Sequence, residues 1–250
     1  MAMRPTLPPE AASWLTSDRP ARVLMVGAVG PYAGILSDRG NAVAVVDKDV
    51  AAVTRLVGRR PDLGGVVGQA EGLPFHPLCF DRVICVQNLH AMAPGLALAE
   101  FARVLAEGGA LGVVYLSRDD SVPWVRRLAA TIQQTLPDAM RGAYGEDSLD
   151  HLRASAYFPR VEHRAYRIWI PSSRQSLVDM ALAAPGAGRL GPEAKDALAE
   201  AVGAVYDSAA RPPEPLLLPY KLSCWRAFVD HNEMTAGIPV PSDPALHITL

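Results

Sequence analysis

The first half of the chain alternates short apolar runs with segments whose apolar residues recur at helical spacing. The apolar runs, each of which predicts a buried strand, cover residues 22–26, 42–46, 64–68, 80–86 and 110–116. Between them, helices are predicted over residues 32–39, 49–57 and 94–105. This alternation predicts an α/β fold with a doubly wound, mostly parallel sheet. Right-handed crossovers would bring the carboxyl ends of the strands to one edge, where ligands bind.

The second half of the chain changes character after Ser117. Amphipathic spacing predicts helices over residues 122–136, 146–156, 173–183 and 192–209, and two further strands over 161–170 and 216–228. Pro219 falls inside the last of these strands, so we expect an edge position, a bulge or a strand that starts only at Tyr220. A short helix is predicted ahead of the first strand, at residues 10–15, and the residues from 230 on are predicted to be irregular.

Glycine and acidic residues punctuate the first strand–helix–strand unit. Gly27 and Gly30 follow the first strand, where glycine allows positive φ and close approach of the backbone to a ligand. Gly40 ends the helix that follows, and residues 107–109 (Glu-Gly-Gly) predict a turn before the fifth strand. Asp47 stands at the carboxyl end of the second strand, where a carboxylate can accept hydrogen bonds from both hydroxyls of a ribose. The alternative for Asp47 is an acid that caps the next helix, but the context favours a nucleoside-binding half.

Composition and charge narrow the classes of partner. The formal net charge of -2 argues against a protein that works mainly through phosphate contacts with nucleic acid. No apolar run reaches membrane-spanning length and the first residues lack the apolar core of a signal peptide, so we expect no membrane partner and a cytoplasmic location. Three cysteines without a C-x-x-C pair predict buried free thiols, and His76 with Cys79 offers too few ligands for a metal site.

Several segments, in order and at the right spacing, resemble class I S-adenosylmethionine-dependent methyltransferases. The resemblance is closest to the type 11 group of small-molecule methyltransferases and covers residues 22–116 well. It is carried by VLMVGAVGPYAGILSDRG, VVDKD, GQAEGLPFHPLCFDRVICVQNLH and EFARVLAEGGALGVV. The resemblance implies S-adenosyl-L-methionine as cofactor, a small-molecule partner and a Rossmann-like sheet of seven strands. One antiparallel strand, over residues 220–228, would be slotted between neighbours near the C-terminus.

The resemblance also assigns roles to individual residues. Gly27, Ala28 and Gly30 would line the methionine part of the cofactor, and Asp47 would hold the ribose. The adenine would be flanked by Lys48 and contacted by Ala70 and Glu71, although Glu71 could equally be an exposed loop acid. Gln87 and Leu89 would lie beneath the reacting end. We expect a single domain over residues 1–250: an extension (1–20), the cofactor-binding core (21–117), a substrate-side cover with the last strands (118–228) and a tail (229–250). The chain could also pair as a homodimer.

Two positions depart from the family pattern and support a second hypothesis. Met25 stands where the family has an acidic residue, and Val29 stands where a glycine normally lies. A valine would be strained if that position needed positive φ, and its side chain would crowd a ligand. The second hypothesis is therefore a methyltransferase-like chain that has lost catalysis and serves as a binding or scaffold protein.

A third hypothesis is a nicotinamide-dependent oxidoreductase, but the glycines do not fit G-x-G-x-x-G. Sheet topology discriminates, because a dinucleotide fold should lack the slotted antiparallel strand. For methyl transfer, positioning of two bound reactants can supply much of the catalysis, so no fixed triad is required and none is found. Two residues keep alternative readings. His90 could act as a general base, although a polar helix start is favoured, and Tyr32 could face the sulfonium or pack in the core.

Overall fold

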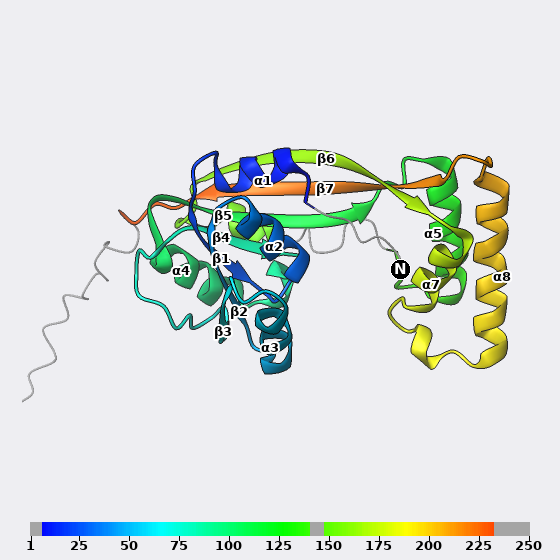
Figure 1. The fold of residues 1–250 in the computed structure, drawn as a ribbon, viewed down its shortest axis with the longest axis horizontal. Coiled ribbons are helices and arrows are strands. Elements are labelled where there is room, and N and C mark those ends of the chain that lie inside the picture. The colour runs from blue at the N-terminus through cyan, green and yellow to red at the C-terminus, as the bar shows by residue number, and fades with distance from the viewer. Residues whose placement is uncertain (1–6, 141–147, 233–250) are drawn as a thin grey trace, which may run out of the picture.

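The computed structural model describes residues 7–140 and 148–232, and in this part of the chain seven strands form one sheet (Figure 1). The strands are β1 (Arg22–Val26), β2 (Ala42–Asp47), β3 (Gly64–Val67), β4 (Phe80–Val86), β5 (Leu105–Arg118), β6 (Arg160–Ser172) and β7 (Leu216–Phe228). Their order across the sheet is β3-β2-β1-β4-β5-β7-β6. The pairs among β1 to β5 are all parallel, whereas β7 lies antiparallel to both β5 and β6.

This topology confirms the predicted doubly wound, Rossmann-like sheet of seven strands. The antiparallel strand near the C-terminus is slotted between β5 and β6, as the resemblance implied. That arrangement also excludes the hypothesis of a nicotinamide-dependent oxidoreductase, because a dinucleotide-binding fold should lack such a strand.

Helices cover both faces of the sheet. They are α1 (Pro9–Thr16), α2 (Gly30–Asp38), α3 (Val50–Arg59), α4 (Pro94–Val104) and α6 (Ser148–Arg153). One hydrophobic cluster joins the sheet to α1, α2 and α3, and another joins its opposite face to α4 and α6. The prediction of a helix over 146–156 is met only in part, because residues 146 and 147 lie outside the described residues and the helix ends at Arg153.

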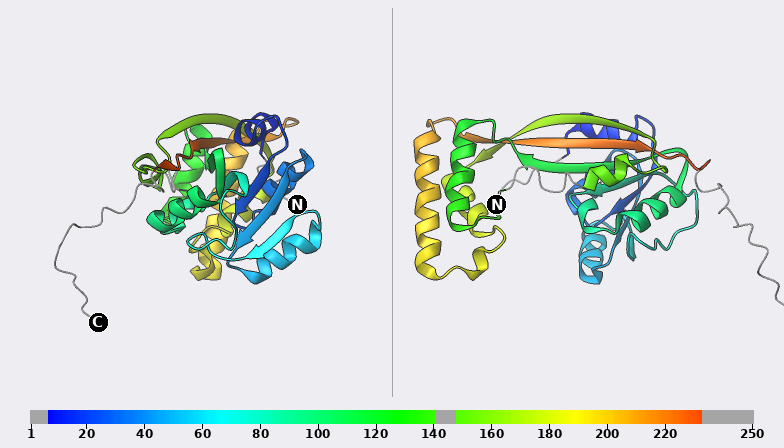
Figure 2. Two further views of the ribbon diagram at one scale, coloured as in Figure 1. Left: turned by 90° about the vertical axis from the view of Figure 1, so that its left-hand side faces the viewer. Right: turned by 180° about the vertical axis from the view of Figure 1, so that it is seen from behind.

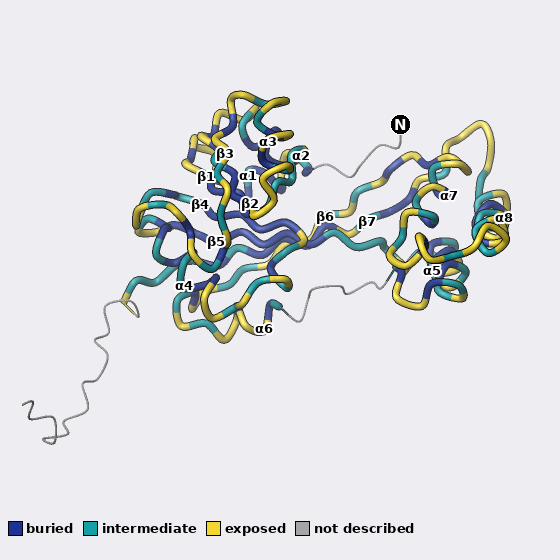
Figure 3. The backbone as a smooth tube through the Cα atoms, turned by 90° about the horizontal axis from the view of Figure 1, so that it is seen from below, coloured by how far each residue is buried: buried dark blue, intermediate teal, exposed yellow. Residues whose placement is uncertain are grey.

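The central strands are apolar at successive positions because both of their faces are buried (Figure 3). In β1, Val23 and Met25 belong to the cluster with α1 and α2, whereas Leu24 and Val26 belong to the cluster with α4. A continuous apolar run is the signature of a strand buried in this way. Met25 is fully buried, so it serves as a core residue of the α2 side.

The boundary between α4 and β5 differs from the sequence prediction of a turn followed by a strand at residue 110. Strand β5 begins at Leu105, immediately after α4, and its register with β4 shifts between the pairs Phe80–Leu105 and Arg82–Ala110. Gly108 has a φ of 71°. The Glu-Gly-Gly segment is therefore an irregularity within a strand, where glycine supplies the positive φ that a bulge needs.

Pro219 sits within β7 without breaking it. The strand already starts at Leu216 and pairs with β6 along its whole length, but its pairing with β5 reaches only Tyr220. The carbonyl of Pro219 accepts a hydrogen bond from the Asp119 backbone amide, 3.0 Å away. Because the nitrogen and carbonyl of one strand residue point to the same side, the missing N–H faces the end of β5. Strand β7 is an interior strand that starts at Leu216, so the expected edge strand and the expected start at Tyr220 are wrong, and the proline is tolerated because it lies beyond the part of β7 that pairs with β5.

Three helices form a bundle at the far end of the three longest strands (Figures 1 and 2). They are α5 (Pro123–Thr135), α7 (Arg174–Leu182) and α8 (Pro192–Ala209). The bundle has a hydrophobic cluster of its own, which also takes in Leu218 of β7. Ser173 begins α7 with a capping box that it shares with Ser176. The long strands thus carry a second group of helices beyond the carboxyl ends of β5 and β6.

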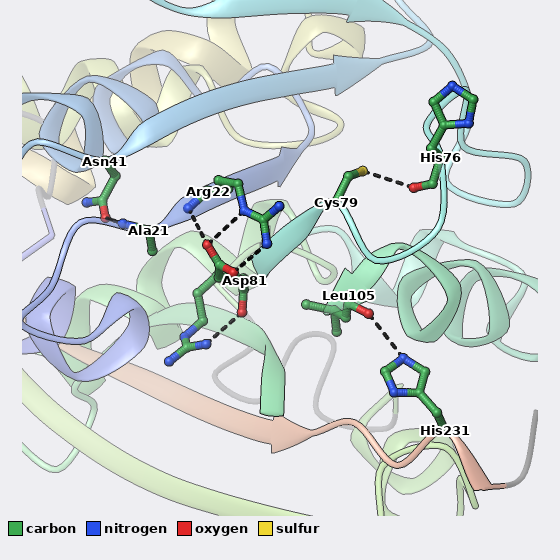
Figure 4. A network of polar contacts seen from close by, with 9 residues as sticks. Ala21, Arg22, Asn41, His76, Cys79, Asp81, Leu105 and His231 are labelled. Carbon is green, nitrogen blue, oxygen red and sulfur yellow. Dashed lines mark hydrogen bonds and ion pairs between the residues drawn. The ribbon is translucent and has the colours of Figure 1, made fainter. Parts of the chain in front are cut away.

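Polar contacts join β1 and β4 at the edge of the sheet where the parallel strands begin (Figure 4). The Asp81 carboxylate at the start of β4 accepts hydrogen bonds from the backbone and guanidinium of Arg22 on β1. This pairing lowers the pKa of Asp81 below its ordinary value. His231 lies close to the carbonyls of Ala102 and Leu105, so the end of the described chain is attached where α4 meets β5.

Candidate active site

A pocket of about 490 Å³ opens at the carboxyl ends of β1, β2 and β4. This is the edge where parallel α/β sheets bind ligands. Its lining comprises Val26, Gly27, Val46, Asp47, Lys48, Gly68, Gln69, Ala70, Glu71, Asn88, Ala91, Met92, Ala93 and Leu96. The pocket therefore takes residues from three strand ends, from the loop after β3 and from the start of α4.

The turn after β1 requires glycine at position 27. Gly27 has a φ of 95°, and a Cβ added there would lie 2.7 Å from Nδ2 of Asn88. Its backbone N–H donates to the Val46 carbonyl at 2.7 Å, while Nδ2 of Asn88 donates to the Val26 carbonyl at 2.6 Å. The turn is thus held between β2 and the residue just after β4, and only glycine fits that space.

Asp47 directs its carboxylate toward this turn and lines the pocket. One oxygen accepts a hydrogen bond from the Ala28 backbone amide at 2.7 Å, and the other accepts from the Asp49 amide at 2.9 Å. A carboxylate offers about four acceptor positions, so two remain after these bonds. That number matches the two hydroxyls of a ribose. The residue that caps α3 is instead Asp49, whose carboxylate accepts from the amides of Ala51 and Ala52.

Val29 does not strain the turn. Its φ is -86°, an allowed value, and it precedes α2 as the N-cap residue. Its side chain is partly buried against the cluster that contains α2, and it is not part of the pocket lining. The expectation of strain at this position is therefore wrong, because the backbone here needs no positive φ, whereas the expected crowding of a ligand stays a prediction.

The loop after β3 closes one side of the pocket and is anchored to α4. Glu71 accepts a hydrogen bond from the Ala93 amide at 2.9 Å, which joins two parts of the lining. Glu100 accepts from the Leu73 amide at 2.7 Å, and Arg103 donates to the carbonyls of Leu73 and Phe75. Glu100 and Arg103 also pair with each other at 2.7 Å. The loop is thus bonded to one helix at several points.

A second pocket, of about 720 Å³, reaches the end of β4 as the first one does. Gln87 lines this second pocket and Asn88, the next residue, lines the first. Gln87 has a φ of 58°, and its side-chain amide donates to the Leu116 carbonyl at 3.1 Å. The rest of the second lining comes from the end of β5, from the bundle helices α5 and α7 with the segments that follow them, and from Tyr220 of β7.

The residues assigned by resemblance are brought together only in part. Those that line the first pocket are Gly27, Asp47, Lys48, Ala70 and Glu71. Ala28 contributes its backbone amide to Asp47, Gly30 starts α2, and Leu89 is buried in the core with α4; none of these three belongs to either lining. The cofactor contacts of all nine residues stay predictions.

Sequence reasoning missed Asn88, which lines the first pocket and fixes the turn. Its position directly after β4 is the signal that could have found it, since strand ends supply ligand contacts. It also missed the segment that leads into α4, since Ala91, Met92 and Ala93 line the pocket together with Leu96 of the first turn of the helix.

Tyr32 and His90, for which the sequence left two roles open, lie in different environments. Tyr32 is buried among the residues of the α2 side, and burial raises its pKa to about 12, which fits core packing. His90 lies in the middle of a short 3₁₀ segment (Leu89–Ala91), and both its amide and its ring nitrogen face the Tyr115 hydroxyl, at 3.2 and 3.3 Å. That hydroxyl lies 2.8 Å from Ser148, so His90 is part of a polar network at the end of β4.

The three cysteines are free thiols. Cys85 and Cys224 are buried, and burial raises the pKa of Cys224 to about 12. Cys79 departs from the prediction, since it is only half-buried and contacts the His76 carbonyl through its thiol at 2.9 Å. Within the described residues there is no group of three His, Cys, Asp or Glu side chains that could hold a metal ion. The same part of the chain contains no helix long and apolar enough to cross a membrane.

The slotted antiparallel strand, with a glycine turn and a strand-end carboxylate around one pocket, defines a class I methyltransferase fold. Comparison with known proteins agrees. Residues 24–113 match the family model described as a methyltransferase domain. An uncharacterized methyltransferase of Mycobacterium tuberculosis is 33% identical over 181 residues, which are 68% of this chain and 74% of that protein. The chain therefore belongs to the methyltransferase family and is a methyltransferase.

Two further relatives extend the comparison. A demethylmenaquinone methyltransferase of Beutenbergia cavernae is 33% identical over 137 residues, which are 54% of this chain and 57% of that protein. The solved structure of a putative type II methyltransferase from Anaeromyxobacter dehalogenans has a TM-score of 0.60 at 20% identity, over 91% of this chain and 98% of that chain. The likeness to that solved structure shows the fold alone.

Proposed function

We propose that this methyltransferase uses S-adenosyl-L-methionine as methyl donor and a small molecule as acceptor. The observation that carries the donor assignment is the Asp47 carboxylate, which lines a pocket beside the Gly27 turn and keeps two acceptor positions for a ribose diol. The sulfonium of the donor supplies the methyl group in an in-line displacement.

The residues present fit this donor in three ways. Gly27 and Asn88 both line the pocket, and Asn88 packs where a Cβ of residue 27 would stand, so the turn presents backbone rather than a side chain to a ligand. Asp47 provides the ribose acceptor. The loop residues Ala70 and Glu71 flank the same pocket, where an adenine ring would be covered. In this proposal the chain binds and orients both reactants, which is the main catalytic contribution that methyl transfer needs.

The second pocket supports a small-molecule acceptor. The two pockets are lined by consecutive residues after β4, Gln87 and Asn88, and the volume of the second is of the size that holds small ligands. The Beutenbergia relative bears a name that states a small-molecule acceptor, demethylmenaquinone, which favours the same class here. A cytoplasmic location, a homodimer and the division of the chain as a single domain stay predictions from the sequence.

Calorimetric titration of the full chain with S-adenosylhomocysteine tests the donor assignment. We expect saturable binding by the native protein. Asp47→Asn should weaken it by about tenfold or more, since a hydrogen bond to a charged group contributes about 1.5–3 kcal/mol. Asp49→Asn is the matched control, because Asp49 caps α3 and does not line the pocket, and its affinity should equal that of the native chain. Absence of binding by the native chain at saturating ligand would overturn the donor assignment and restore the binding-protein hypothesis.

A further inference from the structure

The second pocket combines a mostly apolar wall with one basic residue. Its apolar lining comes mainly from the bundle side and includes Ile132, Met140, Met180 and Pro185. Arg118, the last residue of β5, is the one Lys or Arg among the described residues of this lining. The apolar part of a ligand in this pocket would therefore pack against the bundle, while a negatively charged end of the same ligand would meet Arg118.

Arg118 has no acidic partner among the described residues. Its Nε atom is buried and makes no hydrogen bond, and no ion pair joins its guanidinium to any acid among the described residues. The adjacent Asp119 is engaged elsewhere, since its carboxylate pairs with Arg167 at 2.6 Å and accepts from the Ser121 hydroxyl. The charge of this guanidinium is therefore matched by no acid of the described residues, and an anion in the pocket would accept from its terminal N–H groups.

Other described polar groups of the lining leave the guanidinium as the centre for an anion. The Gln87 amide donates to the Leu116 carbonyl, and Ser117 and Tyr220, which also line the pocket, carry neutral hydroxyls. Asp138 also lines the pocket and brings a negative charge, so a cationic ligand is the competing possibility. A guanidinium group binds a carboxylate through two parallel hydrogen bonds, and the single positive charge of the one matches the single negative charge of the other. A phosphate carries close to two charges and would be matched less well by one arginine.

We propose that the methyl acceptor is an elongated apolar molecule with a carboxylate, and that Arg118 binds this carboxylate in the second pocket. The apolar body of the acceptor lies against the wall formed by α5, α7 and the segments that follow them, where Met140 and Met180 adapt to its shape. That this ligand is the methyl acceptor rests on the proposed function. The binding of a carboxylate by Arg118 does not depend on it.

Titration with simple alkyl probes, without cofactor, tests the proposal. The probes are decanoate, decyl phosphate, decan-1-ol and decyltrimethylammonium, each below its critical micelle concentration. We expect the native chain to bind decanoate at least about tenfold more tightly than the alcohol or the cation, and more tightly than the phosphate. Arg118→Gln should lower the decanoate affinity to that of the alcohol and leave the alcohol unchanged. Arg127→Gln, an exposed arginine of α5 outside the lining, is the matched control and should bind as the native chain does.

The outcomes separate the alternatives. Equal binding of decanoate and decan-1-ol by the native chain, or unchanged decanoate binding by Arg118→Gln, would overturn the proposal. Preference for the cation would assign the polar end to Asp138, and preference for decyl phosphate would overturn the carboxylate. If Arg118→Gln fails to fold, the probe series on the native chain decides alone. Binding of S-adenosylhomocysteine is measured separately, so failure of the donor assignment is distinguishable from failure of this one.

Discussion

At the scale of single residues, the candidate site depends on backbone conformation as much as on side-chain chemistry. Gly27 bends the chain away from β1, and Asp47 fastens the bend by accepting from the Ala28 amide. Asn88 closes the same bend from the side of β4. A glycine, a carboxylate and an amide from three strand ends therefore shape one turn, and that turn forms part of the pocket.

Gly27→Ala should damage both folding and ligand binding. Alanine at a φ of 95° is strained by about 1–2 kcal/mol, and its Cβ would also displace the Asn88 side chain. Urea unfolding should show a loss of at least that size, and S-adenosylhomocysteine should bind more weakly in calorimetry. Gly72→Ala is the control, because a Cβ there meets no atom and φ is not positive. A fully stable Gly27→Ala chain with native affinity would contradict the assigned role of the turn.

At the scale of elements, the loop after β3 is positioned by α4 rather than by its own structure. Glu100 and Arg103 lie one turn apart on the helix and bond to the backbone of Leu73 and Phe75. The hydrogen bonds from Arg103 hold the pKa of Glu100 below its ordinary value. Because both residues bind the loop from one face of α4, the position of the helix determines the position of the loop that forms one side of the pocket.

Glu100→Gln should release this loop, in a manner that depends on pH. At neutral pH the variant should lose about 1.5–3 kcal/mol of unfolding free energy, as expected for hydrogen bonds to a charged group. Because the pKa of Glu100 is lowered on folding, its contribution is fully present above the ordinary value of 4.5 and is lost as the pH falls through the folded value. Urea unfolding at neutral and acidic pH should therefore show the difference from the native chain shrink in acid.

Glu107→Gln is the matched control for that series. Glu107 is exposed on β5, and the described structure shows no side-chain contact for it. Its substitution should leave stability within the error of the measurement at every pH. A difference between Glu100→Gln and the native chain that stays constant into acid would show that the charge of Glu100 is not what stabilises the loop.

The same elements show what the sequence could predict. Periodicity placed β4 and α8 at their observed bounds, because a buried strand and an amphipathic helix carry their burial in the order of residues. It did not place the start of β5, since the Glu-Gly-Gly segment reads as a turn whether it links two elements or bulges from one strand. For the site, the strand-end rule found Asp47, but the burial of Leu89 depends on packing between distant segments, which no local pattern records.

At the scale of the whole molecule, the described residues contain three hydrophobic clusters with different neighbours. Two lie on the faces of the sheet and share its strands, whereas the third lies in the bundle of α5, α7 and α8 (Figure 2). The bundle meets the rest of the molecule through the ends of β5, β6 and β7. The first pocket is lined by residues of the sheet part alone, whereas the second pocket is lined by residues of the sheet part and of the bundle.

This division predicts that damage to the bundle leaves donor binding intact. Leu128→Ala removes a fully buried side chain from the bundle cluster, and Leu24→Ala removes one from the sheet. Each should cost about 2–5 kcal/mol locally. Hydrogen exchange followed by mass spectrometry should show faster exchange in α5, α7 and α8 for Leu128→Ala, with native exchange in β1 to β4. Its affinity for S-adenosylhomocysteine should stay native, whereas Leu24→Ala should weaken it. Faster exchange throughout both parts in Leu128→Ala would show instead that sheet and bundle unfold as one cooperative unit, because the strands they share would then transmit the loss.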